Sequence, residues 1–147
     1  MAKGVKDIKI KYFDKDIERI KINTIGDWID LRAGKDIFIN EGEHCLIPLG
    51  IAMELPDGYE ALMVPRSSTF KTWGILQTNS PAVIDETYCG DDDQWFMSVY
   101  ATRNVVIHKN DRICQFRIVK HQPTIRFEEV ESLSCSNRGG FGSTGTN

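Results

Sequence analysis

Residues 45–64 read CLIPLGIAMELPDGYEALMV, and they contain two apolar runs separated by the turn sequence Pro56-Asp57-Gly58. Two apolar runs that flank a short Pro/Asp/Gly segment are typical of antiparallel strands joined by a tight turn. Further strands are expected at residues 8–12, 36–40, 95–101, 106–108, 112–119 and 124–130. Many short strands at close spacing predict an all-β sandwich or barrel.

Only one stretch, residues 67–73, has a helical pattern. We expect Ser67 or Ser68 to cap this helix and Gly74 to end it. No linker or internal repeat divides the chain, and its composition changes only near the C-terminus. We therefore predict a β domain over residues 1–133 and a flexible C-terminal arm over residues 134–147, which together form one functional unit.

Charge and cysteine usage exclude several classes of protein. The formal net charge of −3 argues against a protein that binds long nucleic acid, which usually needs a basic face. The four cysteines form no CxxC pair and the histidines no metal-binding spacing, so a zinc site is not expected. Reduced cysteines and the absence of a signal-like apolar segment predict a cytoplasmic protein without a membrane-spanning segment.

The chain ends in SNRGGFGSTGTN, residues 136–147. Such a Gly-rich segment loses too much backbone entropy on ordering to form a helix or strand alone. One interpretation is a frayed terminus. The other is a mobile arm that orders over a ligand, with glycines and hydroxyls around phosphates and an aromatic ring over a flat group.

The sequence Val64-Pro65-Arg66-Ser67-Ser68-Thr69 places a guanidinium and two hydroxyls where a strand is expected to meet a helix. These groups suit phosphate oxygens. The alternative is a capped turn that carries a surface arginine.

Two acidic residues follow or interrupt apolar stretches. Asp85, after Val83-Ile84, could hold and deprotonate a water, while Tyr88 could press against a sugar. Alternatively, Asp85 bonds its own turn and Tyr88 packs in the core. Asp30 could reach a metal through water, or could be a strand-end charge.

The segment Asp111-Arg112-Ile113-Cys114-Gln115 places Arg112 and Gln115 three residues apart. In a regular strand their side chains face opposite sides. We expect Arg112 to form a structural ion pair and Gln115 to donate to a ligand.

Five short stretches, taken in chain order, resemble the five motifs of the trimeric all-β dUTPases, in the branch from Gram-positive bacteria and their phages. They are Asp30-Leu31-Arg32-Ala33, Pro65-Arg66-Ser67-Ser68, Val83-Ile84-Asp85 with Tyr88 and Gly90, Asp111-Arg112-Ile113 with Gln115, and residues 139–145. The resemblance implies a distorted jelly-roll subunit, a homotrimer with shared active sites, and hydrolysis of dUTP to dUMP and pyrophosphate. That reaction limits uracil incorporation into DNA and supplies dUMP for thymidylate synthesis.

The resemblance also implies roles for individual residues. Asp85 would activate the water that attacks the α-phosphorus, and Mg²⁺ on the triphosphate would be reached by Asp30, through water. Tyr88 would stack on deoxyribose and reject UTP, and Phe141 would stack on uracil. The phosphate-contacting residues would be Arg66, Ser67, Ser68, Asn79, Gln115, Arg138, Gly142, Ser143 and Thr144.

This chain departs from the family pattern in several places. Many members have two more residues between the arm arginine and phenylalanine, so Arg138 would reach a phosphate by a different path. Ala82 stands where many have glycine. The stretch Asp91-Asp92-Asp93-Gln94-Trp95 is longer and more acidic than usual, and Trp95 either lines the base pocket or packs in the core.

Two other functions are compatible with the same fold. A dCTP deaminase-like relative would be expected to carry glutamate where Asp85 stands, so the intact Asp85 and Tyr88 favour dUTP hydrolysis. A phage-type regulator that binds a repressor protein would use exposed surface such as Asp91–Asp93, in addition to a complete catalytic set.

Overall fold

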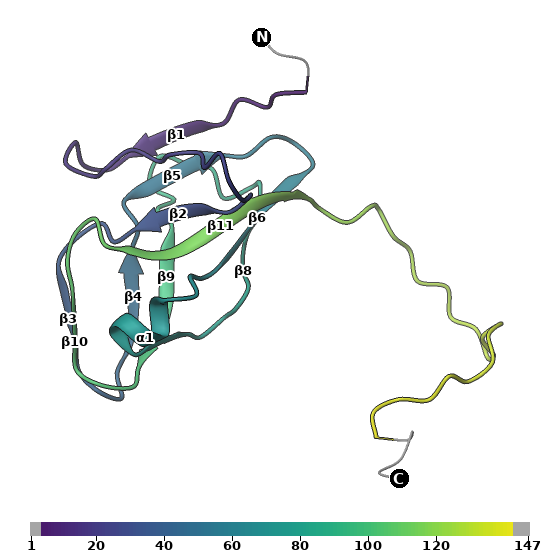
Figure 1. The fold of residues 1–147 in the computed structure, drawn as a ribbon. Coiled ribbons are helices and arrows are strands. Elements are labelled where there is room, and N and C mark those ends of the chain that lie inside the picture. Colours follow the sequence, from purple (N-terminus) through teal and green to yellow (C-terminus); the bar gives the residue numbers. More distant parts are fainter. Residues whose placement is uncertain (1–3, 143–147) are drawn as a thin grey trace.

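The computed structural model describes residues 4–142, and within them the chain is almost entirely β (Figure 1). The strands are β1 (Lys9–Tyr12), β2 (Ile29–Arg32), β3 (Ile37–Ile39), β4 (His44–Pro48), β5 (Ile51–Glu54), β6 (Tyr59–Pro65), β7 (Ile75–Gln77), β8 (Ala82–Ile84), β9 (Phe96–Ala101), β10 (Val105–Ile107) and β11 (Arg112–Lys120). One short helix, α1 (Thr69–Trp73), lies between β6 and β7. This confirms the predicted all-β, jelly-roll-like sandwich with a single short helix.

The strands form four small antiparallel sheets. The largest has the order β2-β11-β6-β8, and a second has the order β4-β9-β7. The pairs β1-β5 and β10-β3 complete the body. None of the seven strand pairs in these sheets joins strands that are consecutive in the chain, so the segments that carry the predicted motifs become neighbours through long-range pairing.

The core is apolar and lies between these sheets. Its largest fully buried side chains include Trp95 and Phe116, whose rings meet edge to face with centroids 5.4 Å apart. Edge-to-face packing suits the ring quadrupoles. Of the two interpretations of Trp95, the structure supports the packed core residue, because none of its surface is exposed.

The sequence predicted one continuous strand over residues 45–55, but the structure divides it into β4 and β5. The division falls at Leu49-Gly50, where Gly50 has a φ of 71°. A Cβ at Gly50 would lie 2.1 Å from Cδ1 of Ile17, so both the backbone conformation and the close packing require glycine.

The helix is bounded largely as predicted. Gly74 ends it in the left-handed conformation, with a φ of 67°, and its N–H donates to Phe70 O at 2.7 Å. Ser68 occupies the N-cap position but makes no side-chain capping bond, so the predicted serine cap is wrong in that respect. Instead the buried hydroxyl of Thr69 accepts from Arg66 N at 2.8 Å and donates to Ile113 O at 2.9 Å.

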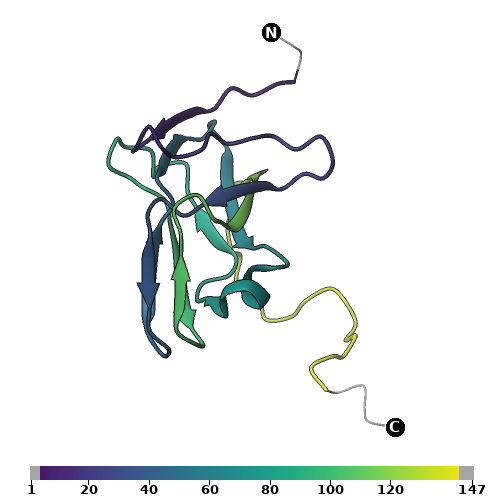
Figure 2. The same ribbon diagram turned by 60° about the vertical axis from the view of Figure 1, so that its left-hand side comes forward.

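The strand expected at residues 124–130 is wrong. Beyond β11 the described chain leaves the body as an extended segment without assigned strand structure, which Figures 1 and 2 show from two directions. Its apolar side chains Ile125, Phe127 and Val130 are more than half exposed. Alternation of apolar and polar residues suits a strand locally, but a ladder also needs a neighbouring strand, which this segment does not have in the single chain.

Candidate active site

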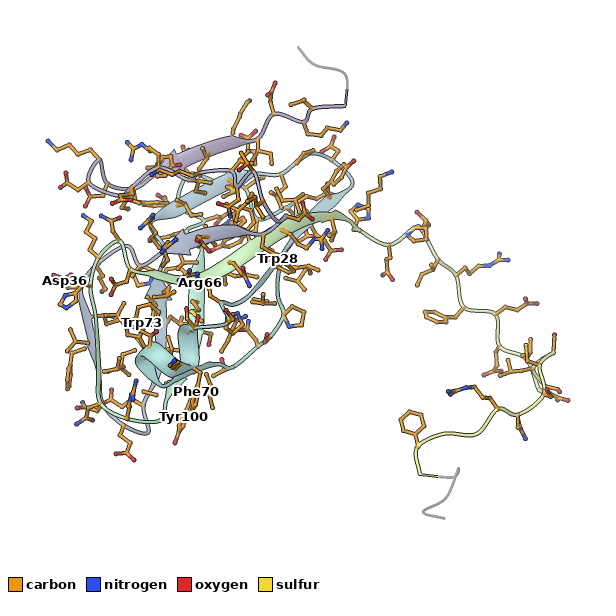
Figure 3. The ribbon with its side chains drawn as sticks, in the orientation of Figure 1. Trp28, Asp36, Arg66, Phe70, Trp73 and Tyr100 are labelled. Atoms are coloured by element: carbon orange, nitrogen blue, oxygen red, sulfur yellow. The ribbon has the colours of Figure 1, made fainter. Side chains whose placement is uncertain are left out.

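Four polar side chains meet at one end of the largest sheet, from β2, from β11 and from the residue directly after β6. We call them the arginine cluster: Asp30, Arg66, Arg112 and Gln115. Asp30 and Gln115 are direct partners in the β2-β11 ladder and therefore lie on the same face. The Asp30 carboxylate pairs with Arg66 Nε at 3.1 Å and with Arg112 Nη1 at 3.3 Å. Arg66 lies between α1 and β11 (Figure 3) and also donates to Arg112 O at 3.1 Å.

A change of register brings Arg112 into this cluster. The β2-β11 ladder shifts between Arg112 and Cys114, as a β-bulge does, so Arg112 and Gln115 both reach the Asp30 side. The expectation that they face opposite sides is wrong for this reason. The ion pair predicted for Arg112 is confirmed, and Gln115 donates from Nε2 to Pro65 O at 3.2 Å.

The two serines predicted to contact phosphate directly follow Arg66 in the chain. Ser67 is exposed and Ser68 is half-buried, in the turn between β6 and α1. Asn79 is exposed in the turn between β7 and β8, and its carbonyl accepts from Gln77 Nε2 at 3.4 Å. Ala82, at the start of β8, pairs with Met63 on β6, and the two strands are antiparallel. Asn79 comes three residues before Ala82 and therefore lies toward the Pro65 end of β6, next to Arg66.

Asp85 lies directly after β8, in a turn whose hydrogen bonds favour its ionised form. Both the backbone N–H of Thr87, at 3.0 Å, and the Thr87 hydroxyl donate to Asp85 Oδ2. These bonds favour the carboxylate and hold the pKa of Asp85 below its usual range. Sequence reasoning did not identify Thr87, although a Thr two residues after an Asp is a signal for such a turn.

Beside Asp85, Glu86 and His121 tie together three segments. The Glu86 carboxylate accepts from Gly58 N at 2.7 Å and lies 3.2 Å from His121 Nε2. His121 Nδ1 lies 3.0 Å from Gln122 O. Both ring nitrogens therefore face acceptors, which only the imidazolium satisfies, and the Gln122 carbonyl and Glu86 raise the pKa of His121. No sequence pattern indicates this pair, because its two members lie on segments far apart in the chain.

Tyr88 lies on the same turn, partly exposed. Its hydroxyl donates to Gln94 O at 2.7 Å, and its N–H donates to Asp85 O at 3.0 Å. Partial burial and the nearby Asp93 carboxylate raise the pKa of Tyr88, so the hydroxyl stays a donor near neutral pH.

The Asp85 turn and the arginine cluster are separated within the chain. Ile84, next to Asp85, pairs with Ala61 on β6, whereas Arg66 lies five residues further along the same segment. At about 3.4 Å per residue this corresponds to roughly 17 Å. One chain therefore does not bring the two predicted halves of the site together.

The C-terminal arm does not close over either half. Arg138 is exposed and donates only weakly to the neighbouring Gly139 O, at 3.4 Å. The Phe141 ring is fully exposed, and Gly142 follows it with a φ of 88°. The predicted phosphate contacts Ser143 and Thr144 lie outside the described residues.

A groove beside Asp85 is lined by the acidic residues Glu60, Asp85 and Glu86, by His121, and by residues 122–125, which follow β11. Within the described residues, no group of three or more His, Cys, Asp or Glu side chains is arranged to hold a metal ion by itself. No helix in that part of the chain is long and apolar enough to cross a membrane.

These features define an enzyme class: a cluster of cationic and amide groups can bind a polyanion, and an exposed, ionised carboxylate can activate a water. The family model for dUTPase matches residues 15–145. The chain belongs to the dUTPase family, and its enzymatic class is that of a dUTP diphosphatase.

Individual relatives agree with the predicted branch. The SPbeta prophage-derived deoxyuridine 5'-triphosphate nucleotidohydrolase of Bacillus subtilis (strain 168) is 58% identical over 139 residues, which cover 95% of this chain and 98% of the relative. The deoxyuridine 5'-triphosphate nucleotidohydrolase of Clostridium tetani is 36% identical over 94% of this chain and 96% of the relative. The family assignment decides in favour of dUTP hydrolysis over a deaminase.

Solved structures with a similar fold are also dUTPases. A Staphylococcus bacteriophage 80alpha dUTPase mutant with dUpNHpp superposes with a TM-score of 0.78 at 18% identity, over 96% of this chain and 99% of that one. A mutant dUTPase from phage phi11 of S. aureus, in which a structural Mg(II) ion is coordinated, gives 0.75 at 14% identity, over 88% of this chain and 100% of that one. At these identities the likeness concerns the fold.

Proposed function

We propose that this chain hydrolyses dUTP to dUMP and pyrophosphate, with Asp85 as the base that activates the attacking water. The observation that carries this assignment is the pair of hydrogen bonds from Thr87 to the Asp85 carboxylate. Two hydrogen bonds keep the carboxylate ionised and oriented while its side chain stays exposed beside a groove. An ionised, oriented carboxylate is what general-base catalysis requires.

The arginine cluster is the proposed triphosphate-binding half. Arg66 supplies a guanidinium at the edge of the cluster, Ser67 and Ser68 supply hydroxyls beside it, and Gln115 supplies an amide donor. Asp30 and Arg112 hold Arg66 from two sides, so its planar fork is oriented before a phosphate arrives. Asn79 at the same end of β6 is proposed to contact the phosphates as well.

Mg²⁺ is the proposed cofactor, and the residues present fit it in one particular way. Asp30 is a single carboxylate, its side chain is one quarter exposed, and two arginines already pair with it. Mg²⁺ commonly keeps several waters and is held by one or two carboxylates together with substrate phosphates. Asp30 would therefore reach the ion through water, and the ion when bound would neutralise phosphate charge.

Tyr88 is proposed to stack against the deoxyribose and to leave no room for a 2'-hydroxyl. Phe141 on the arm is proposed to cover uracil, and Arg138 and Gly142 to approach the phosphates with Ser143 and Thr144. Closure of the arm would exclude water other than the nucleophile.

A homotrimer with shared sites is supported by the separation of the two halves. A phosphate at Arg66 cannot also lie within attack distance of a water on Asp85 of the same chain, across roughly 17 Å. Asp85 of one copy next to the arginine cluster of another removes this difficulty. The free cysteines suit a cytoplasmic location. Binding of a regulatory protein stays a prediction, because no contact described here favours it.

The test is pyrophosphate release from dUTP, dTTP, dCTP and UTP, with Mg²⁺, by the wild type and by Asp85→Asn. We expect selective turnover of dUTP, and its loss by at least about a hundredfold in Asp85→Asn, the lower range for a general base. Asp92→Asn, a matched change at an exposed carboxylate in the next turn, should leave turnover intact. Unchanged hydrolysis in Asp85→Asn would overturn the base assignment.

A further inference from the structure

The acid-rich turn after Tyr88, which the family resemblance left unexplained, is an ordered structure. The Asp93 carboxylate accepts from Gly90 N at 2.8 Å, and Asp93 N donates to Gly90 O at 3.1 Å. Gln94 N donates to Asp92 O at 2.9 Å. Asp93 therefore closes its own turn, and its charge is used within the turn.

Two contacts fasten this turn to the body. Lys11 on β1 donates from Nζ to Asp91 O at 2.9 Å. The side-chain Oε1 of Gln94 accepts from Gly50 N at 3.0 Å, at the bend between β4 and β5. Gly50 is buried, so Gln94 satisfies a backbone donor that would otherwise be unpaired.

Gln94 also connects to the proposed sugar-binding residue. Its backbone oxygen accepts from the Tyr88 hydroxyl at 2.7 Å, while Tyr88 N donates to Asp85 O. The tyrosine is thus held at both ends. One end is fixed by the catalytic turn, and the other by a residue that is itself anchored to Gly50.

We propose that Gln94 is a positioning residue that fixes the ring of Tyr88 and thereby sets the discrimination between deoxyribose and ribose. The inference rests on the proposed role of Tyr88 as the group that rejects the 2'-hydroxyl. Rejection by contact depends on ring displacements of about 0.5 Å, because repulsion between atoms rises steeply with overlap. The side chain of Gln94 acts at a distance from substrate, through the Tyr88 hydroxyl.

The test compares Gln94→Met, which keeps the side-chain length and removes the acceptor, with Gln94→Glu, which keeps an acceptor for Gly50 N. Loss of the acceptor leaves a buried N–H unpaired, so the backbone before Trp95 must shift to admit water. We expect the ratio of kcat/KM for dUTP to that for UTP to fall by roughly two- to tenfold in Gln94→Met, the range for one neutral hydrogen bond. In Gln94→Glu the ratio should stay within about twofold of wild type.

A second variant removes the Tyr88 donor of the hydrogen bond between the Tyr88 hydroxyl and Gln94 O. Tyr88→Phe removes the donor and leaves both Gln94 and Gly50 in place, so it keeps the test available if Gln94→Met does not fold. It should lower the same ratio by a similar factor. In a double-mutant cycle the two effects should be clearly less than additive, because both remove the same restraint.

Two results would overturn the inference, and they are distinguishable from a failure of the proposed function. An unchanged dUTP-to-UTP ratio in Gln94→Met, with a lower melting temperature, would make Gln94 a structural residue only. Additive effects in the cycle would show that Gln94 does not act through Tyr88. An unchanged ratio in Tyr88→Ala would instead refute Tyr88 as the sugar-discriminating group.

Discussion

Mixing two inactive variants tests whether the active site is assembled from different copies of the chain. Asp85→Asn removes the proposed base, and Arg66→Ala removes the proposed phosphate contact. Because Ile84 pairs with Ala61, five residues before Arg66, the two changed groups are roughly 17 Å apart along β6. That distance is too large for one chain to hold a phosphate and attack it with a water on Asp85.

The expected recovery follows from counting copies. In a randomly mixed equimolar trimer, half of the copies carry an intact Asp85 and the other half an intact Arg66. A site that takes these residues from two copies is complete in about a quarter of cases. We therefore expect about a quarter of wild-type activity in the unsorted mixture, and about a third once homotrimers are removed, because every mixed trimer then contains one complete site out of three. A site built within one chain recovers none, since no chain carries both intact residues.

The assay is pyrophosphate release from dUTP after co-expression of differently tagged variants, purified through both tags in succession. Each variant alone should be inactive. A matched control mixes Asp85→Asn with Asp85→Ala, two changes of the same residue, and should recover nothing. Absence of recovery in doubly tagged Asp85→Asn and Arg66→Ala mixtures would refute the shared-site geometry.

Three further variants test single contacts. Thr87→Val removes the hydroxyl bond that lowers the pKa of Asp85, so the acidic limb of the pH–kcat profile should move to higher pH; an unmoved limb would contradict this. His121→Gln removes a cation whose pKa the folded state raises, so its melting temperature should fall furthest below wild type at pH under about 6.5, and the difference should close as pH rises through the raised pKa. Thr69→Val loses two buried hydrogen bonds and should destabilise by about 1–3 kcal/mol in thermal unfolding, and a neutral effect would show that water replaces them.

The sequence predicted most strands because each depends on local apolar patterning and on turn residues. Pro56-Asp57-Gly58 separates β5 from β6, and Gly74 ends α1, as expected. The division of residues 45–55 escaped prediction because it depends on Ile17, which packs against Gly50 from a distant part of the chain. Local pattern does not contain that contact.

The candidate site was predictable in residue type but not in assembly. Asp30, Arg66 and Gln115 were chosen one by one, and only the strand order β2-β11-β6 makes them neighbours. The bulge that brings Arg112 to Asp30 is a change of register between two strands, which a single-strand pattern cannot show. Gln94 and His121 act through contacts with Gly50 and Glu86, distant in the chain, which the sequence does not indicate.

Two features of the single chain have one explanation in common. The segment after β11 carries exposed apolar side chains, Ile125 and Phe127, with the alternation of a strand but no neighbouring strand in the described chain to pair with. The Asp85 turn, which carries the proposed base, and the arginine cluster are both formed, yet they lie roughly 17 Å apart along β6. Exposed apolar surface is unfavourable in water, and a reaction needs the base and the phosphate-binding groups at the same phosphate. Association with further copies of the chain would bury the exposed apolar side chains and would bring the Asp85 turn of one copy to the arginine cluster of another. Stability and activity would therefore depend on the same assembly.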